Sequence, residues 1–154
     1  MNFNINEYDK SDFCGDKNML LEKCTYKDID KLTQLNKQLI EDEMSDNAMS
    51  IEELKNRMKT FLDTDYEAYF FTVNSEVIGY ALINISVKPI YLRQFLISRE
   101  YRRNHYGETA FMLLKEKLNI DTIDIEVLSW NEAGKAFWEK LGFIERSRYM
   151  RYTN

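Results

Sequence analysis

At 154 residues, with 44% hydrophobic and 31% charged residues, the chain has the composition of one soluble globular domain with a hydrophobic core. The 26 acidic and 21 basic residues leave a net charge of −5, which argues against nucleic acid as the main partner. No apolar stretch approaches the roughly 20 residues that span a bilayer, and the first 19 residues lack the apolar segment of a signal peptide. We therefore expect a cytoplasmic protein without a membrane partner.

The cysteines and the histidine further limit which metal sites, disulfides and catalytic triads the chain can form. Cys14 and Cys24 fit neither a zinc spacing nor a disulfide framework, so reduced thiols are favoured over a disulfide between them. Because His105 is the only histidine, a His-based metal site or a Ser-His triad is hard to assemble. We expect no metal.

The first half of the chain predicts a strand followed by two helices. Residues 1–18 are polar and without periodicity, so they form an expected N-terminal extension ahead of a domain at residues 19–154. A short strand is expected at Leu20–Cys24. Apolar residues at helical spacing then follow two capping boxes, Thr25 with Asp28 and Ser50 with Glu53. The two expected helices have apolar faces formed by Ile29, Leu32, Leu35 and Leu39, and by Leu54, Met58, Phe61 and Leu62.

The second half alternates strands with helices. A hairpin with a turn at Asn74-Ser75 is followed by a third strand and then by a helix from Glu108 to Leu118. The strands of this half are expected at 68–73, 77–85, 91–97, 122–128 and 143–152, and a last helix from Asn131 to Leu141 with Gly142 as its C-terminal cap. The order β-α-α-β-β-β-α-β-α-β predicts an α/β fold, a mixed central sheet with helices on both faces.

The segment Arg102-Arg103-Asn104-His105-Tyr106-Gly107 is the strongest functional signal in the sequence. It is basic and turn-forming, and it lies between a buried strand and the start of a helix. The first turn of a helix has unpaired N–H groups and a partial positive charge, which together bind anions. The segment therefore predicts a phosphate or pyrophosphate site.

Four segments in this order make the chain similar to the GNAT superfamily of acetyl-CoA-dependent N-acetyltransferases. They are Val77-Ile78-Gly79-Tyr80-Ala81, Phe95-Leu96-Ile97 with the following Arg102, the loop at 102–107, and Asn131 through Trp138-Glu139-Lys140-Leu141-Gly142-Phe143. The resemblance extends from about Met19 to the C-terminus. It implies a GNAT-like sheet whose fourth and fifth strands splay apart, with acetyl-CoA as cosubstrate.

The resemblance also implies which residues hold the cofactor. Backbone N–H groups of the loop would bind the pyrophosphate, and backbone groups of the fourth strand would pair with the pantetheine arm and polarise the thioester carbonyl. The implied cofactor-binding residues are Phe95, Leu96, Ile97, Arg102, Arg103, Asn104, His105, Tyr106, Gly107, Glu108, Asn131 and Trp138.

Two residues depart from the family pattern. His105 stands where the family usually has glycine, so the loop needs either an ordinary φ or a histidine that tolerates the left-handed region. Trp138 stands where many members have a tyrosine that protonates the departing thiolate, and an indole is no proton source near neutral pH. A thiol with a pKa of about 8.5 nevertheless leaves as a thiolate without much help.

Catalytic candidates are weaker. Glu126, on the expected fifth strand, could accept the amine proton, or it is an exposed residue of the outer face. Tyr149, like Tyr106 and Tyr152, is a candidate proton donor or a packing aromatic. The acidic run at 41–43 either attracts a cationic amine or is a solvated helix end.

The sequence therefore predicts an N-acetyltransferase in which a small-molecule or peptide primary amine attacks acetyl-CoA directly in a ternary complex. A CoA-binding module that has lost catalysis and serves as a sensor is the alternative, and an unrelated α/β nucleotide binder is a weaker one. A homodimer is an arrangement that the sequence leaves open.

Overall fold

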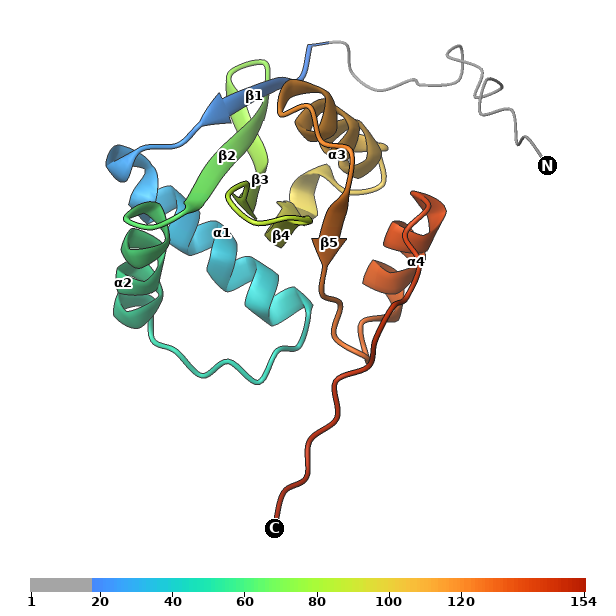
Figure 1. Cartoon of the computed structure of the whole chain (residues 1–154). Coiled ribbons are helices and arrows are strands. Elements are labelled where there is room, and N and C mark those ends of the chain that lie inside the picture. The colour runs from blue at the N-terminus through green and yellow to red at the C-terminus, as the bar shows by residue number, and fades with distance from the viewer. Residues whose placement is uncertain (1–17) are drawn as a thin grey trace, which may run out of the picture.

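A five-stranded mixed sheet organises the part of the chain that the computed structural model describes, residues 18–154. The strands are β1 (Leu20–Lys23), β2 (Tyr66–Val73), β3 (Glu76–Asn84), β4 (Ile90–Ile97) and β5 (Ile123–Ile125). The α-helices are α1 (Ile29–Asp42), α2 (Ile51–Leu62), α3 (Tyr106–Lys117) and α4 (Glu132–Lys140), and short 3-10 turns lie at Tyr26–Asp28 and Arg99–Tyr101 (Figure 1).

The strands lie in chain order across the sheet, β1-β2-β3-β4-β5. The first four pair antiparallel, and β4 pairs with β5 in parallel. The parallel pair is connected through α3, as a crossover between parallel strands requires. The expected mixed α/β fold is therefore confirmed.

Two apolar clusters, one on each face of the sheet, hold the helices in place. On one face, the sheet residues Phe71, Ile78 and Ile97 pack with Phe111 and Leu114 of α3. On the other face, a second cluster joins α1 and α2 to β2, β3 and β4 through Leu32, Leu35, Met58, Tyr80 and Leu96. Both expected capping boxes form, at Thr25 and Ser50, so each N-terminal helical segment begins where the sequence predicts.

A β-bulge in β4 changes which face of the sheet its side chains occupy. Leu82 pairs with Gln94 while the next residue of β3, Ile83, pairs with Leu92, so Arg93 is an extra residue in β4. Because a bulge shifts the side-chain alternation by one residue, Leu92 packs in the cluster beneath α3 and Leu96 packs in the cluster beneath α1. The hydrophobic pattern alone did not reveal this change of face.

The expected final strand, 143–152, is not part of the sheet in this chain. The segment carries no strand assignment, and beyond Phe143 its residues are exposed. The expected extension at 1–18 lies, except for Asn18, outside the described residues, as does Cys14, while Cys24 is a free and buried thiol. Within residues 18–154, no helix is long and apolar enough to cross a membrane.

The buried hydroxyl of Tyr80 tests this core. Its side chain is fully buried, and the hydroxyl donates to Oε1 of Gln94 at 2.8 Å. Tyr80→Phe leaves that buried oxygen without this donor, so we expect the free energy of unfolding to fall by about 1–3 kcal/mol. Urea denaturation measures the change. The exposed Tyr152→Phe is the control, and equal midpoints for the two variants would contradict the burial of this hydrogen bond.

Candidate functional site

The gap between β4 and β5 is the centre of the candidate site. The two strands pair only at Ile90–Ile123, Tyr91–Asp124 and Leu92–Ile125. Beyond Leu92, the residues of β4 pair with β3 alone. The backbone edge that faces away from β3 is therefore left without a partner strand over the second half of β4, as the expected splay requires. An unpaired edge of this kind can hydrogen-bond an extended ligand as if it were another strand.

The predicted anion loop lies at the end of β4 and leads into α3. Arg103 and His105 have φ values of 66° and 59°, so both adopt the left-handed region on either side of Asn104. The histidine therefore adopts the conformation that the family glycine favours. Among the described residues, none of the backbone N–H groups of residues 103–108 donates to a backbone carbonyl. Consecutive N–H groups in such a turn at a helix N-terminus form a concave anion site.

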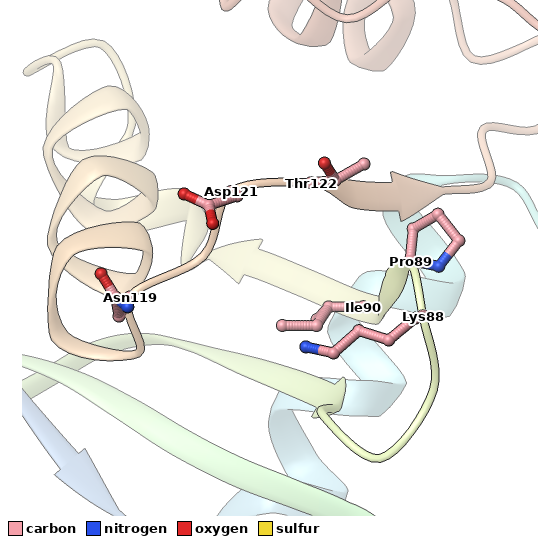
Figure 2. A pocket seen from close by; sticks show the side chains of 6 residues that line it. All are labelled: Lys88, Pro89, Ile90, Asn119, Asp121 and Thr122. Carbon is pink, nitrogen blue, oxygen red and sulfur yellow. The ribbon is translucent and has the colours of Figure 1, made fainter.

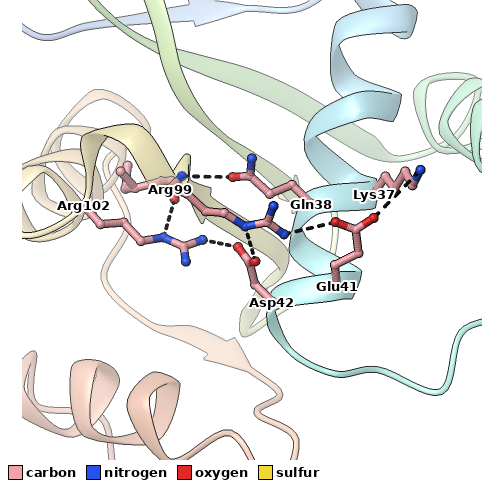
Figure 3. A network of polar contacts seen from close by, with 7 residues as sticks. Lys37, Gln38, Glu41, Asp42, Arg99 and Arg102 are labelled. Carbon is pink, nitrogen blue, oxygen red and sulfur yellow. Dashed lines mark hydrogen bonds and ion pairs between the residues drawn. The ribbon is translucent and has the colours of Figure 1, made fainter.

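The side chain of Arg102 turns away from this loop and toward α1 (Figure 3). Its Nε donates to the carbonyl of Ile97 at 2.9 Å, and its guanidinium forms an ion pair with Asp42. Arg99 reinforces the contact, with Nε 2.6 Å from Asp42 Oδ1 and a terminal nitrogen 3.0 Å from Glu41 Oε2. We call these four residues, Glu41, Asp42, Arg99 and Arg102, the arginine–carboxylate network.

For Glu41 and Asp42, this network corrects both interpretations of the acidic run at 41–43. Glu41 and Asp42 are neither free to attract an amine nor simply solvated, because two arginines from the β4–α3 connection bind them. The backbone N–H of Arg99 also donates to Gln38 of α1 at 3.1 Å. The end of α1 and the start of the anion loop are therefore tied together, which the sequence did not predict.

The glycine of the loop faces α4. A Cβ added at Gly107 would lie 3.0 Å from Cε2 of Phe137 and 3.8 Å from Ile97, so the absence of a side chain lets α3 approach α4. The Glu108 carboxylate, one residue later, forms an ion pair with Lys140 at the end of α4. Gly107 thus has a packing role besides the expected backbone role in anion binding.

Asn131 and Trp138 have clear structural partners in α4. The side chain of Asn131 caps the helix by accepting from the Gly134 N–H at 3.0 Å. The ring of Trp138 packs edge-on against Phe95, Phe111 and Phe143, at centroid distances of 5.2, 5.6 and 5.1 Å. Their contact with a cofactor stays a prediction. The neighbouring Phe137, which the sequence analysis missed, stacks on Phe95 at 6.1 Å and lies against Gly107.

On the face of the sheet that α1 and α2 cover, polar groups gather beside the end of α1. Burial, together with the nearby Asp42, raises the pKa of the Glu43 carboxyl above its usual range. The backbone carbonyl of Glu43 accepts from Trp130 Nε1 at 2.9 Å, which joins the end of α1 to the segment before α4. Burial raises the pKa of the Tyr80 hydroxyl, and Glu43 adds to that increase.

Glu126 lies on this same polar side, close to Tyr91. Burial raises the pKa of Tyr91, and the Glu126 carboxylate raises it further. Glu126 is exposed and directly follows β5, where the strand has parted from β4. Tyr149 is not brought to it, because Tyr149 lies on the exposed C-terminal tail beside Arg151. The catalytic roles of both residues stay predictions.

A pocket of about 480 Å³ lies elsewhere, where β4 and β5 are still paired. Figure 2 shows its lining side chains at the start of β4 and in the connection between α3 and β5. They are Lys88, Pro89, Ile90, Asn119, Asp121 and Thr122, and none belongs to the loop, the splay or the predicted catalytic set. We do not assign the chemistry to this pocket.

The contacts that the sequence analysis missed share one cause. Asp42 and Arg102 are 60 residues apart, and Gly107 and Phe137 are 30 apart, so only the fold brings each pair together. Phe137 gave a weak signal, because it directly precedes Trp138 within the last family-like segment.

Comparisons with known structures agree with this fold. A possible acetyltransferase from Clostridium difficile 630 superposes with a TM-score of 0.72 at 17% identity, covering 90% of this chain and 98% of that one. The aminoglycoside N-acetyltransferase AAC(6')-Iy in complex with CoA has a TM-score of 0.69 at 15% identity, covering 88% and 94%. A predicted acetyltransferase from Clostridium acetobutylicum with acetyl-CoA has a TM-score of 0.67 at 18% identity, covering 88% and 96%.

These similarities show the fold, and a sequence comparison with curated proteins gives no significant match. The family model for GNAT acetyltransferases matches residues 32–143, which include most of α1, the splayed strands, the anion loop and α4. The chain belongs to the GNAT acetyltransferase family.

Proposed function

We propose that this protein is an acetyl-CoA-dependent N-acetyltransferase that acts on a primary amine. The observation that carries the proposal is the coincidence of two unpaired backbone surfaces, the edge of β4 and the N–H groups of the loop at 103–108. They meet where β4 leads into α3 through a short 3-10 turn. An extended arm and a pyrophosphate, the two parts of CoA, match this pair of surfaces. Family membership and structural neighbours solved with CoA or acetyl-CoA support it.

In this proposal the protein positions acetyl-CoA and stabilises the charge that develops during the reaction. N–H groups of the loop bind the pyrophosphate, and backbone groups near Phe95 pair with the pantetheine arm. The Ile97 carbonyl accepts a hydrogen bond from Arg102 Nε, so the end of β4 also holds the side chain of the residue that begins the loop. A backbone N–H of β4 stabilises the negative charge that develops on the thioester oxygen when the amine attacks. The tetrahedral adduct then collapses, the C–S bond breaks, and the thiolate leaves.

The acceptor enters, in this proposal, beside the end of α1, on the side of the sheet that α1 and α2 cover. Glu43 and Glu126 provide carboxylates there, and Tyr91 and Trp130 provide aromatic surface. Negative and aromatic groups attract a cationic amine. Glu126 is the proposed base that accepts the proton from the attacking amine. AAC(6')-Iy, with a similar fold, is solved with a bisubstrate analogue containing acetylneamine, so aminoglycoside-like amines belong in the panel of acceptors to be tested.

The first experiment measures CoA binding and turnover separately. We expect calorimetry to show acetyl-CoA binding and a thiol-release assay to show turnover with at least one amine among polyamines, aminoglycosides, amino acids and peptides. Binding without turnover on any amine would favour the CoA sensor, for which the absence of a tyrosine at position 138 is the motivating observation. Failure to bind acetyl-CoA would refute both.

The arginine–carboxylate network should influence cofactor affinity through the shape of the loop. Asp42→Asn removes the charge that holds both Arg99 and Arg102, so we expect the Kd for acetyl-CoA to rise about fivefold, equivalent to about 1 kcal/mol. Calorimetry measures the change. Glu41→Gln is the matched control, because it removes only the contact between Glu41 and Arg99 and leaves both arginine contacts of Asp42 in place. Equal affinities in the two variants would show that the Asp42 contacts do not shape the loop.

The role of Glu126 can be tested by its effect on turnover alone. We expect Glu126→Gln to lower kcat/KM at pH 7 by about 100-fold and to leave the Kd for acetyl-CoA unchanged. Part of the rate should return at pH 9, because more of the acceptor amine is then already deprotonated. Asp124→Asn, an exposed carboxylate of β5 two residues before Glu126, is the control. Full activity of Glu126→Gln would transfer the proposed base role to Glu43, for which Glu43→Gln is the next variant.

A further inference from the structure

Two arginines stack on one aromatic ring between α2 and β4. The guanidinium carbon of Arg57, on α2, lies 5.2 Å from the centre of the Phe61 ring, and that of Arg93, on β4, lies 5.1 Å from the same centre. The guanidinium carbon of Arg93 also lies 5.8 Å from the centre of the Tyr66 ring. Because the face of an aromatic ring attracts a cation, Phe61 and Tyr66 gather both charges in one place. We call Arg57 and Arg93 the arginine pair.

The bulge in β4 directs Arg93 to this place. The side chain of Gln94 lies on the face of the sheet that α1 and α2 cover, where it accepts from the buried Tyr80 hydroxyl. In a regular strand the preceding residue would point to the opposite face. Because the bulge sets two consecutive residues against one residue of β3, Arg93 instead contacts Phe61 and Tyr66 on the same face as Gln94.

The arginine pair has no acidic partner in the part of the chain that the structure describes. Within residues 18–154, no ion pair joins Arg57 or Arg93 to a carboxylate, and the hydrogen bond from Arg93 goes to the neutral Tyr66 hydroxyl at 3.4 Å. Burial lowers the pKa of Arg57, and the nearby charge of Arg93 lowers it further. Two neighbouring cations without an anion are costly, and their N–H donors form planar forks that fit a carboxylate.

The arginine pair is close to the side chains that the proposed reaction uses. Arg93 is exposed and Arg57 is only partly buried, so an anion from solvent can reach them. Burial raises the pKa of Tyr91, the carboxylate of Glu126 adds to the increase, and the charge of Arg93 opposes it. Tyr91 is therefore near both a free cation and the proposed base, on the side of the sheet where we place the acceptor.

We propose that the arginine pair binds an anionic group of the acceptor, so that the substrate is a primary amine that also carries a carboxylate. This inference rests on the proposed N-acetyltransferase function and narrows its acceptors from amines in general to amino-carboxylic acids. The carboxylate accepts charge-assisted hydrogen bonds from Arg57 and Arg93 while the amine faces Glu126, which fixes the orientation of the acceptor. A polyamine or an aminoglycoside carries several positive charges, so the arginine pair repels it.

Turnover of matched acceptors tests the arginine pair. Glycine, β-alanine and γ-aminobutyrate are each compared with their amides, which keep the amine and the chain length but lack the negative charge. For the preferred acid, we expect Arg57→Gln and Arg93→Gln each to lower the ratio of kcat/KM for the acid to kcat/KM for its amide about tenfold. Comparing this ratio between variants cancels the difference in amine basicity. It also cancels any loss of folded protein, because both rates come from one enzyme sample.

Two further variants separate a specific contact from a general charge effect. Arg93→Lys keeps the positive charge and should retain more of the ratio than Arg93→Gln does. Lys59→Gln removes the same charge from an exposed position of α2 outside the arginine pair, so it should leave the ratio within about twofold of the parent. An unchanged ratio in both glutamine variants of the arginine pair, or an equal fall in Lys59→Gln, would overturn the proposal.

NMR provides a measure that does not need turnover, so it separates this inference from the proposed function. The Nε–H signals of Arg57 and Arg93, assigned from the two glutamine variants, should move when the preferred acid is added in the presence of CoA and stay in place with its amide. If no amine is turned over, γ-aminobutyrate is the probe. Signals that move without any turnover would support the anion site and refute the acetyl transfer. Signals that stay in place with all three acids would overturn the anion site, even in an active acetyltransferase.

Discussion

The extra residue in β4 is the constraint on which the rest of the candidate site depends. Arg93 interrupts the ladder with β3 directly after Leu92, and Leu92 is also the last residue of β4 that pairs with β5. A bulge bends its strand and increases its twist, so the two strands part at this point. Without it, β4 and β5 would continue as paired neighbours, and no backbone edge would be available to an extended cofactor.

The same bulge places the cofactor surfaces and the polar groups around Glu43 on opposite faces of the sheet. Before it, Leu92 points to the face of α3; after it, Leu96 points to the face of α1, and Phe95 reaches the aromatic residues of α4. The cofactor surfaces and the polar groups around Glu43 therefore approach the same gap from different sides. The arginine–carboxylate network then connects them, because Arg102 contacts both the end of β4 and α1.

The sequence predicted the features that depend on local pattern and failed where distant residues meet. The capping boxes at Thr25 and Ser50, the helix faces and the left-handed tolerance of His105 follow from short-range rules, and the structure contains them. The bulge at Arg93 has no local signature, since the surrounding apolar run reads as a continuous buried strand. The contact of Gly107 with Phe137 also required the fold, because it depends on how closely α3 approaches α4.

The C-terminal tail, residues 143–154, shows a different limit of prediction from sequence, because its strand-like pattern disagrees with its structure. Residues 143–152 have the aromatic and β-branched character of a strand, yet the strand is not formed in the single chain. A strand needs a partner edge, and secondary structure that depends on a neighbour cannot be decided from one chain alone. The first residue of this segment stays packed on the domain, because the rings of Trp138 and Phe111 contact Phe143 whether or not the following residues are paired. The tail therefore leaves the domain from a fixed point, and its strand-like pattern stays without a ladder in the described chain.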